Sequence, residues 1–78
     1  GKGEFSKVAD IYKTLFSVID NINYAIKAMD NYAKAKNSKY LLHISAMARN
    51  KGINMKEEVL KRGIDGPVRL YAVLTNKF

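Results

Sequence analysis

The fold of this 78-residue chain is decided by residues 8–33, which read VADIYKTLFSVIDNINYAIKAMDNYA. Apolar side chains recur here at steps of three and four residues, as in a helix with one buried face. The seam positions of this pattern are Val8, Ile11, Leu15, Val18, Ile22, Ala25, Met29 and Tyr32. A second set widens the face beyond a coiled-coil seam: Tyr12, Phe16, Ile19, Ile26 and Ala33. The pattern predicts one helix of about 30 residues, from Lys7 to Lys36, with Ser6 as its N-cap.

The weakest part of this predicted helix is the stretch Asp20-Asn21-Ile22-Asn23. Short Asp and Asn side chains compete with the helical backbone for hydrogen bonds, so a kink or a break is the alternative here. The apolar spacing keeps its phase across the stretch, and neither Gly nor Pro interrupts residues 7–36. We therefore expect the helix to continue through it.

A second helix is expected over Lys39–Asn50. Either residue of the pair Asn37-Ser38 can act as its N-cap, because both side chains accept hydrogen bonds from free backbone N–H groups. Gly52 fits as its C-terminal stop, since glycine readily adopts the left-handed backbone that ends a helix.

A third, shorter helix is expected over Met55–Arg62. Asn54 stands three residues before Glu57, in a variant of the capping box that marks a helix start. Lys61 and Arg62 suit the negative end of the helix dipole, and Gly63 follows as the stop.

The last helix is expected to begin at Pro67, because Asp65-Gly66 reads as a turn and proline suits the first helical position. Its apolar residues are Val68, Tyr71, Ala72 and Leu74, with Phe78 extending the face. A strand is the alternative, since residues 68–75 are rich in β-branched and aromatic side chains. A lone strand would have no pairing partner, which favours the helix.

These segments together predict an all-α fold, a small helical bundle in which one long N-terminal helix is followed by three short helices. Residues 1–4 are expected to be a disordered start or a cloning remnant, and residues 5–78 a single helical domain. A domain of this size buries a small core and is marginally stable.

The composition narrows the classes of function. Fourteen Lys and Arg face seven Asp and Glu, so the chain carries a formal charge of +7, which favours polyanionic partners. The absence of cysteine excludes disulfides, thiolate zinc sites and cysteine nucleophiles, and it fits a reducing compartment; we expect a cytoplasmic protein. No apolar run reaches the roughly 20 residues that a membrane span needs.

The positive charge is concentrated between Asn31 and Lys56, where the sequence has no acidic residue. Uncompensated Lys and Arg side chains are what phosphate backbones attract. We predict a nucleic-acid contact here, carried by Lys34, Lys36, Lys39, Arg49, Lys51 and Lys56 and extended by Lys61, Arg62 and Arg69. A solvated face without a ligand is the other interpretation. Tyr32 and Tyr40 would either stack on bases or pack internally.

Residues 43–64 also have the order of a helix-turn-helix motif, with Ala48 and Gly52 four apart. However, Glu58 stands where that motif requires a buried apolar residue, and Glu57 and Glu58 would face the phosphates of the DNA. Ordinary packing of two helices is therefore the preferred interpretation.

The apolar seam of the long helix offers a second kind of partner. It is expected to form the internal core, and any surplus could pair two copies in a homodimer. The alternative function is therefore a helical protein–protein interaction module, such as an inhibitor, an immunity-type protein or a complex subunit that docks an acidic partner. Residues 34–51 could lie on anionic lipid as a basic amphipathic helix, but they lack Trp and their apolar face is needed internally, which disfavours a membrane surface.

Enzyme chemistry is not indicated. His43 is the only histidine and is expected to be a partly buried structural residue, so no metal site is predicted. Asp10, Asp20 and Asp30 are interpreted as a charged flank that pairs with nearby lysines. Without a Gly-rich phosphate loop or a serine nucleophile elbow, the sequence predicts no catalytic residue and no cofactor. It predicts a small basic nucleic-acid-binding domain that contacts mainly the phosphate backbone.

Overall fold

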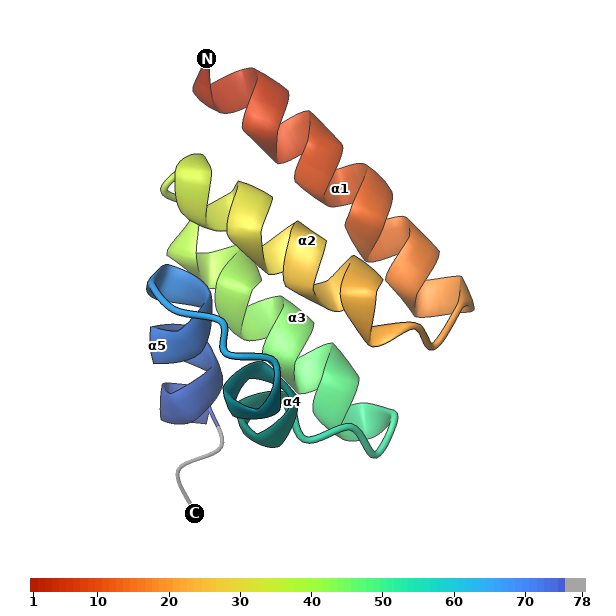
Figure 1. Cartoon of the computed structure of the whole chain (residues 1–78). Coiled ribbons are helices and arrows are strands. Elements are labelled where there is room, and N and C mark those ends of the chain that lie inside the picture. The colour runs from red at the N-terminus through yellow and green to blue at the C-terminus, as the bar shows by residue number, and fades with distance from the viewer. Residues whose placement is uncertain (76–78) are drawn as a thin grey trace.

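The computed structural model describes residues 1–75, all of whose regular structure is helical. The elements are α1 (Lys2–Val18), α2 (Ile22–Lys34), α3 (Ser38–Asn50), α4 (Met55–Lys61) and α5 (Pro67–Thr75). This arrangement confirms the predicted all-α fold (Figure 1). The expected extension of the last apolar face at Phe78 lies outside the described residues.

The predicted single helix from Lys7 to Lys36 is wrong, because the chain breaks between α1 and α2. Ile19 ends α1 in an extended conformation, with φ −114° and ψ 120°. Asn21 is also extended, and its side-chain oxygen accepts a hydrogen bond of 3.0 Å from the backbone N–H of Asn23. The Asn21 side chain thus caps the start of a new helix. It competes with the helical backbone for hydrogen bonds, and this is why the chain breaks here instead of continuing as one helix.

The start of α1 also differs from the prediction. The helix begins at Lys2 with Gly1 as its N-cap, so Ser6 lies inside the helix and caps nothing. The N-terminal amine lies 3.5 Å from the Glu4 carboxylate, on the first turn of the helix.

The Asn54 cap, the two glycine stops and the proline start predicted for the shorter helices are confirmed. In contrast, α3 begins at Ser38 and no side chain caps it, and α4 ends at Lys61 with Arg62 as its C-cap. Asn54 caps α4 by accepting a 3.1 Å hydrogen bond from the N–H of Glu57. Gly52 and Gly63 follow α3 and α4 with φ of +77° and +67°, the left-handed conformation that favours glycine. Pro67 is the first residue of α5.

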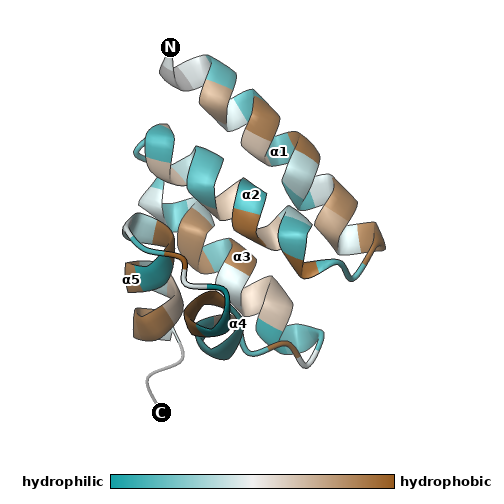
Figure 2. Cartoon of the chain, viewed as in Figure 1, coloured by the Kyte–Doolittle hydropathy of each residue, from teal (hydrophilic) through white to brown (hydrophobic). Residues whose placement is uncertain are grey.

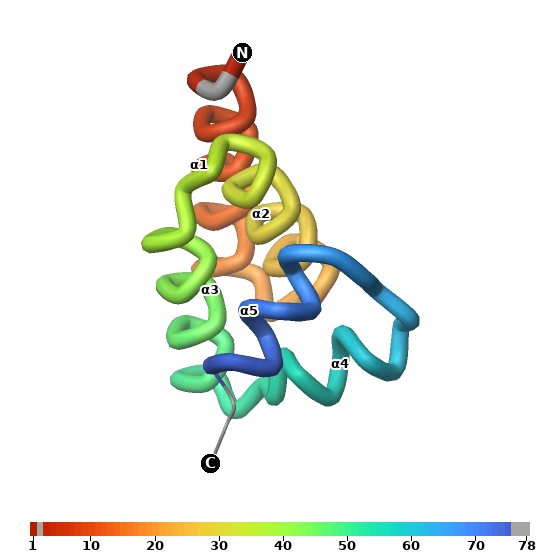
Figure 3. The backbone as a smooth tube through the Cα atoms, turned by 90° about the vertical axis from the view of Figure 1, so that its left-hand side faces the viewer, coloured from red at the N-terminus to blue at the C-terminus, as the bar shows by residue number. Residues whose placement is uncertain are grey.

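The first three helices run down, up and down again, each antiparallel to its neighbour (Figure 1). α1 packs mainly on α2, α2 also packs on α3 and α5, and α5 packs on α3 and α4. Seen from the side, α3 lies along one edge of the molecule and α4 at the opposite edge (Figure 3). α1 and α3 are therefore both outer helices, with α2 between them.

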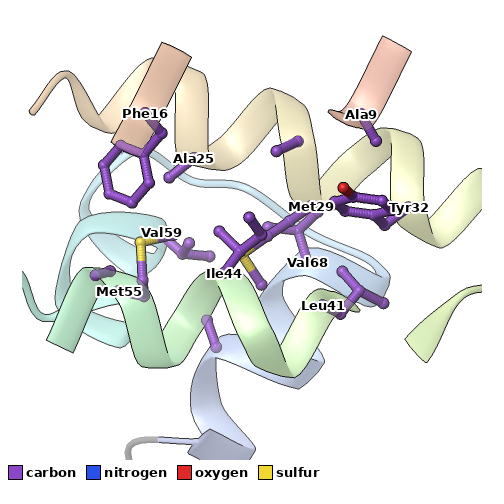
Figure 4. Packing of buried hydrophobic residues seen from close by; sticks show 13 residues of the cluster. Ala9, Phe16, Ala25, Met29, Tyr32, Leu41, Ile44, Met55, Val59 and Val68 are labelled. Atoms are coloured by element: carbon purple, nitrogen blue, oxygen red, sulfur yellow. The ribbon is translucent and has the colours of Figure 1, made fainter. Parts of the chain in front are cut away.

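The core lies where α2, α3, α4 and α5 meet and where α1 adds two side chains (Figure 4). The largest fully buried side chains are Phe16, Met29, Tyr32, Leu41, Ile44, Met55 and Val59. Ala9 and Phe16 are the α1 residues in this core, and both have no exposed surface. Within the predicted seam, Ala25, Met29 and Tyr32 on α2 are buried and Ile22 is partly buried, whereas Val8, Ile11 and Val18 on α1 are exposed.

Candidate nucleic-acid interface

The acid-free segment 31–56 spans the end of α2, all of α3 and the start of α4. Lys34, Lys36 and Lys39 lie around the turn between α2 and α3. Arg49, Lys51 and Lys56 lie around the turn between α3 and α4, at the other end of α3. Since a 13-residue helix is about 20 Å long, the structure divides the six predicted residues between the two ends of α3 instead of gathering them in one cluster.

Two of the predicted binding residues are ion-paired within the chain. The Lys34 ammonium lies 3.2 Å from the Asp30 carboxylate, one helical turn away. The Lys51 ammonium pairs with Asp20 and donates a 3.2 Å hydrogen bond to the backbone oxygen of Ser17, and only 19% of its side chain is exposed. Lys51 therefore ties the end of α3 to the α1–α2 turn, a structural role that reduces its availability to a ligand.

Two of the three residues expected to extend the interface, Arg62 and Arg69, are also paired. Arg62 lies 3.3 Å from the Glu58 carboxylate, and Arg69 lies 3.0 Å from that of Asp65. The Arg49 guanidinium donates a hydrogen bond to the backbone oxygen of Thr75, which connects α3 to α5. These three side chains are thus partly engaged within the protein.

Four of the nine predicted residues have no carboxylate within ion-pair distance among residues 1–75: Lys36, Lys39, Lys56 and Lys61. All four are exposed. Lys36 and Lys39 flank the turn at the start of α3, whereas Lys56 and Lys61 lie on α4. The ammonium groups of Lys36 and Lys39 are therefore the strongest candidates for contact with an anion on the α3 edge.

The turn that positions Lys36 and Lys39 is closed by two backbone hydrogen bonds. The N–H of Lys36 donates to Ala33 at 3.0 Å, and the N–H of Asn37 donates to Tyr32 at 2.9 Å. Lys36 has φ +57°, the left-handed conformation in which such helix ends are closed. This places a lysine where glycine is usual.

The outer face of α3 carries no carboxylate. At helical spacing it exposes Lys39, Leu42, His43, Ala46, Arg49 and Asn50. His43 is exposed on this face and meets the ring of Tyr40 edge-on, with centroids 6.1 Å apart, so the expectation of a partly buried histidine is wrong. The neighbouring helix α5 has no acidic residue either.

The starts of α3 and α5 lie close together. Ser38 and Pro67, their first residues, line one shallow hollow of about 260 Å³ with Lys36, Leu41 and Tyr71. No local pattern in the sequence predicts this approach, because two entire helices, α3 and α4, and two turns separate these helix starts.

Tyr32 and Tyr40, the tyrosines of the acid-free segment 31–56, pack against other side chains of the protein. Tyr32 is fully buried, and its ring stacks on that of Tyr40 at a centroid distance of 5.0 Å. The Lys13 ammonium lies 5.1 Å from the centroid of Tyr40. Of the two expected roles, stacking on bases or internal packing, Tyr32 has the second.

The geometry of α3 and α4 also departs from a helix-turn-helix motif. α4 buries Met55 and Val59, and Glu58 pairs with Arg62 at its surface. Since Glu57 is exposed on the same short helix, α4 presents carboxylates where a DNA-reading helix presents cations. The interpretation as ordinary helix packing is the one that the structure supports.

The aspartates of the expected charged flank have three different partners. Asp30 pairs with Lys34 within its helix, as predicted, whereas Asp20 pairs with Lys51 and Asp10 accepts a hydrogen bond from Tyr32.

Residues 1–75 contain no group of three His, Cys, Asp or Glu side chains that could hold a metal ion. Across the same residues, every helix is too short or too polar to cross a bilayer.

Comparison with known proteins found no matching family model, curated protein or solved structure.

Proposed function

We propose that this chain binds nucleic acid through its phosphate backbone, with the α2–α3 turn and the outer face of α3 as the contact surface. The observation that carries the proposal is the pair Lys36 and Lys39. Both side chains are exposed, and neither has a carboxylate partner among the described residues. Lys36 precedes α3 and Lys39 lies in its first turn, and the outer face of this helix has no acidic side chain.

The physical basis is the release of counterions from the phosphates. A cation without an internal partner neutralises a phosphate at no cost to another ion pair, whereas Lys34 or Lys51 would first have to leave Asp30 or Asp20. The formal charge of +7 adds a long-range attraction that brings the polyanion to the surface. Such contacts position the protein without reading sequence.

The test is fluorescence anisotropy of labelled duplex and single-stranded oligonucleotides, titrated at several salt concentrations between about 50 and 200 mM. The informative variant is Lys36→Asn/Lys39→Gln, because Asn tolerates the left-handed backbone at position 36. The matched control is Lys7→Gln/Lys27→Gln, which removes the same charge from exposed positions on α1 and α2.

The Lys36→Asn/Lys39→Gln variant should lower the slope of log affinity against log salt by about 1.8 on duplex DNA and by about 1.4 on single strands, which corresponds to two phosphates. The control should leave the slope nearly unchanged. An equal effect in both variants would show a diffuse attraction without a defined surface and would overturn the proposal. A salt-independent affinity would overturn it as well.

A second candidate function is a helical protein–protein interaction module. It is favoured by the exposed apolar side chains of α1, among them Ile11 at 61% and Val18 at 79% exposure. A protein partner held by such contacts should stay bound at about 0.5 M salt, where exposed charge interactions are screened, and heparin should not displace it.

A further inference from the structure

The outer side of α1 carries an apolar stripe made of Val8, Ile11, Leu15 and Val18. Val8 is 40% exposed, Ile11 61% and Val18 79%, while Leu15 is half-buried. In Figure 2, hydrophobic positions recur along α1 between hydrophilic and intermediate ones. We refer to these four residues as the α1 stripe.

Packing within the described part of the chain does not explain why α1 carries these apolar side chains on its outer side. α1 packs mainly on α2, and it does so through other residues, because Ala9 and Phe16 are its fully buried side chains. At 100° per residue, the stripe is centred roughly opposite Lys13, the residue that reaches Tyr40 of α3. The stripe therefore faces away from the rest of the molecule.

The spacing of the stripe is self-complementary. Its four residues follow steps of three, four and three, so the pattern is the same when it is read in either direction. An antiparallel pair of α1 helices with a two-fold axis opposite Lys13 places Val8 against the partner's Val18 and Ile11 against the partner's Leu15. A hollow of about 310 Å³, lined by Asp10, Ile11, Thr14 and Leu15, lies near the middle of the stripe.

The charges beside the stripe also favour the antiparallel direction. The last turn of α1 has no basic residue, and Asp20, which pairs with Lys51 of its own chain, follows it with 68% of its side chain exposed. Lys7 is exposed and has no ion-pair partner among the described residues. The antiparallel pair brings Lys7 beside the partner's Asp20 and the negative end of the partner's helix, whereas a parallel pair would align the two helix dipoles and place Lys7 near its own copy.

We infer that α1 is a homodimer interface in which the α1 stripes of two copies pack antiparallel about a two-fold axis. Two 17-residue helices, each about 25 Å long, should bury less surface area against each other than a standard interface does, so the dimer should be weak, with a Kd on the order of 10–100 µM. Since α2 separates α1 from α3, Lys36 and Lys39 stay accessible in the dimer (Figure 1).

The test is sedimentation equilibrium of the full chain at protein concentrations from about 1 µM to 1 mM, a range that brackets the expected Kd. The variants are Val8→Lys, Val18→Glu and the double variant Val8→Lys/Val18→Glu, and circular dichroism checks their helix content. The matched control is Leu60→Glu, an equally apolar residue on α4 with 43% exposure.

Each single variant should weaken the dimer by roughly 100-fold or more, because the two-fold axis repeats the substitution at both ends of the interface. The double variant should recover at least about tenfold of this loss, since only an antiparallel pair brings the introduced ammonium opposite the introduced carboxylate. Leu60→Glu should dimerise as the wild type does.

Four results would overturn the inference. The wild type could remain an 8.8 kDa monomer throughout the concentration range. A dimer that Val18→Glu leaves unaffected would exclude α1 as the interface. A double variant that dimerises more weakly than either single variant would exclude the antiparallel register. A monomer that instead binds anionic phospholipid vesicles through Ile11 and Val18 would assign the stripe to a lipid surface.

Discussion

The phenolic hydroxyl of Tyr32, in α2, donates a hydrogen bond to the carboxylate of Asp10, in α1. The ring of Tyr32 is fully buried, so the bond leads from the core to the exposed Asp10 at the surface. Burial raises the pKa of the Tyr32 hydroxyl well above its usual value, and the hydrogen bond to the Asp10 carboxylate raises it further. This contact joins the outermost helix to the centre of the fold.

Tyr32→Phe should therefore lower the free energy of unfolding by about 1.5–3 kcal/mol, the range for a hydrogen bond to a charged group. Urea titration followed by circular dichroism measures the change. Tyr24→Phe is the control, since the structure gives its hydroxyl no hydrogen bond among residues 1–75, and it should be nearly neutral. An equal loss in both variants would contradict the assigned role of the bond.

The same hydroxyl makes stability depend on alkaline pH. The pKa of Tyr32 is higher in the folded chain than the value of about 10 in the unfolded chain, so the folded state holds this proton more tightly. Its contribution is complete below about pH 10 and is lost as the pH rises above that value. The free energy of unfolding should fall more steeply between about pH 10 and 12 in the wild type than in Tyr32→Phe, and parallel curves would refute the prediction.

The break between α1 and α2 depends on the Asn21 cap. Asn21→Ala should cost about 1 kcal/mol of stability, because the hydrogen bond to the N–H of Asn23 is lost, whereas Asn21→Asp should retain it. Thermal unfolding compares the two variants. If Asn21→Ala proved more stable and more helical than the wild type, the two helices would have fused, and the cap would not be what separates them.

Lys36 stands in the left-handed conformation, where an L-residue is strained. Lys36→Gly should raise the stability by up to about 1 kcal/mol, while Lys39→Gly, inside α3, should lower it by about 1 kcal/mol. Both changes remove one positive charge from the same surface, so their opposite signs isolate the backbone effect. A melting temperature that fell in both would contradict the assigned geometry.

Two apolar residues of α1 should respond very differently to truncation. Phe16→Ala should cost about 3–5 kcal/mol, because the fully buried ring leaves a cavity, and this is a large part of the stability of so small a domain. Val18→Ala should change the monomer by less than about 0.5 kcal/mol, since its side chain is 79% exposed. Urea denaturation at low protein concentration separates this effect from dimerisation.

The sequence by itself determined the features that depend on near neighbours in the chain. The period of three and four residues identified the helical segments, and Asn54, Gly52, Gly63 and Pro67 marked starts and stops that the structure confirms. The Asn21 break was visible only as an alternative, because the strength of a single cap against a continuing helix is a small energy difference.

Only the tertiary structure decided which parts of each helix face the core and which cations keep their charge uncompensated. The helical period sets the angle between Phe16 and Val18 on α1. The side on which α2 packs decides that Phe16 is buried and Val18 is exposed. Similarly, residues 31–56 have no acidic residue, yet Lys51 is paired with Asp20 from the α1–α2 turn. Burial and ion pairing arise between segments distant in the chain, and a local pattern contains no information on how those segments meet.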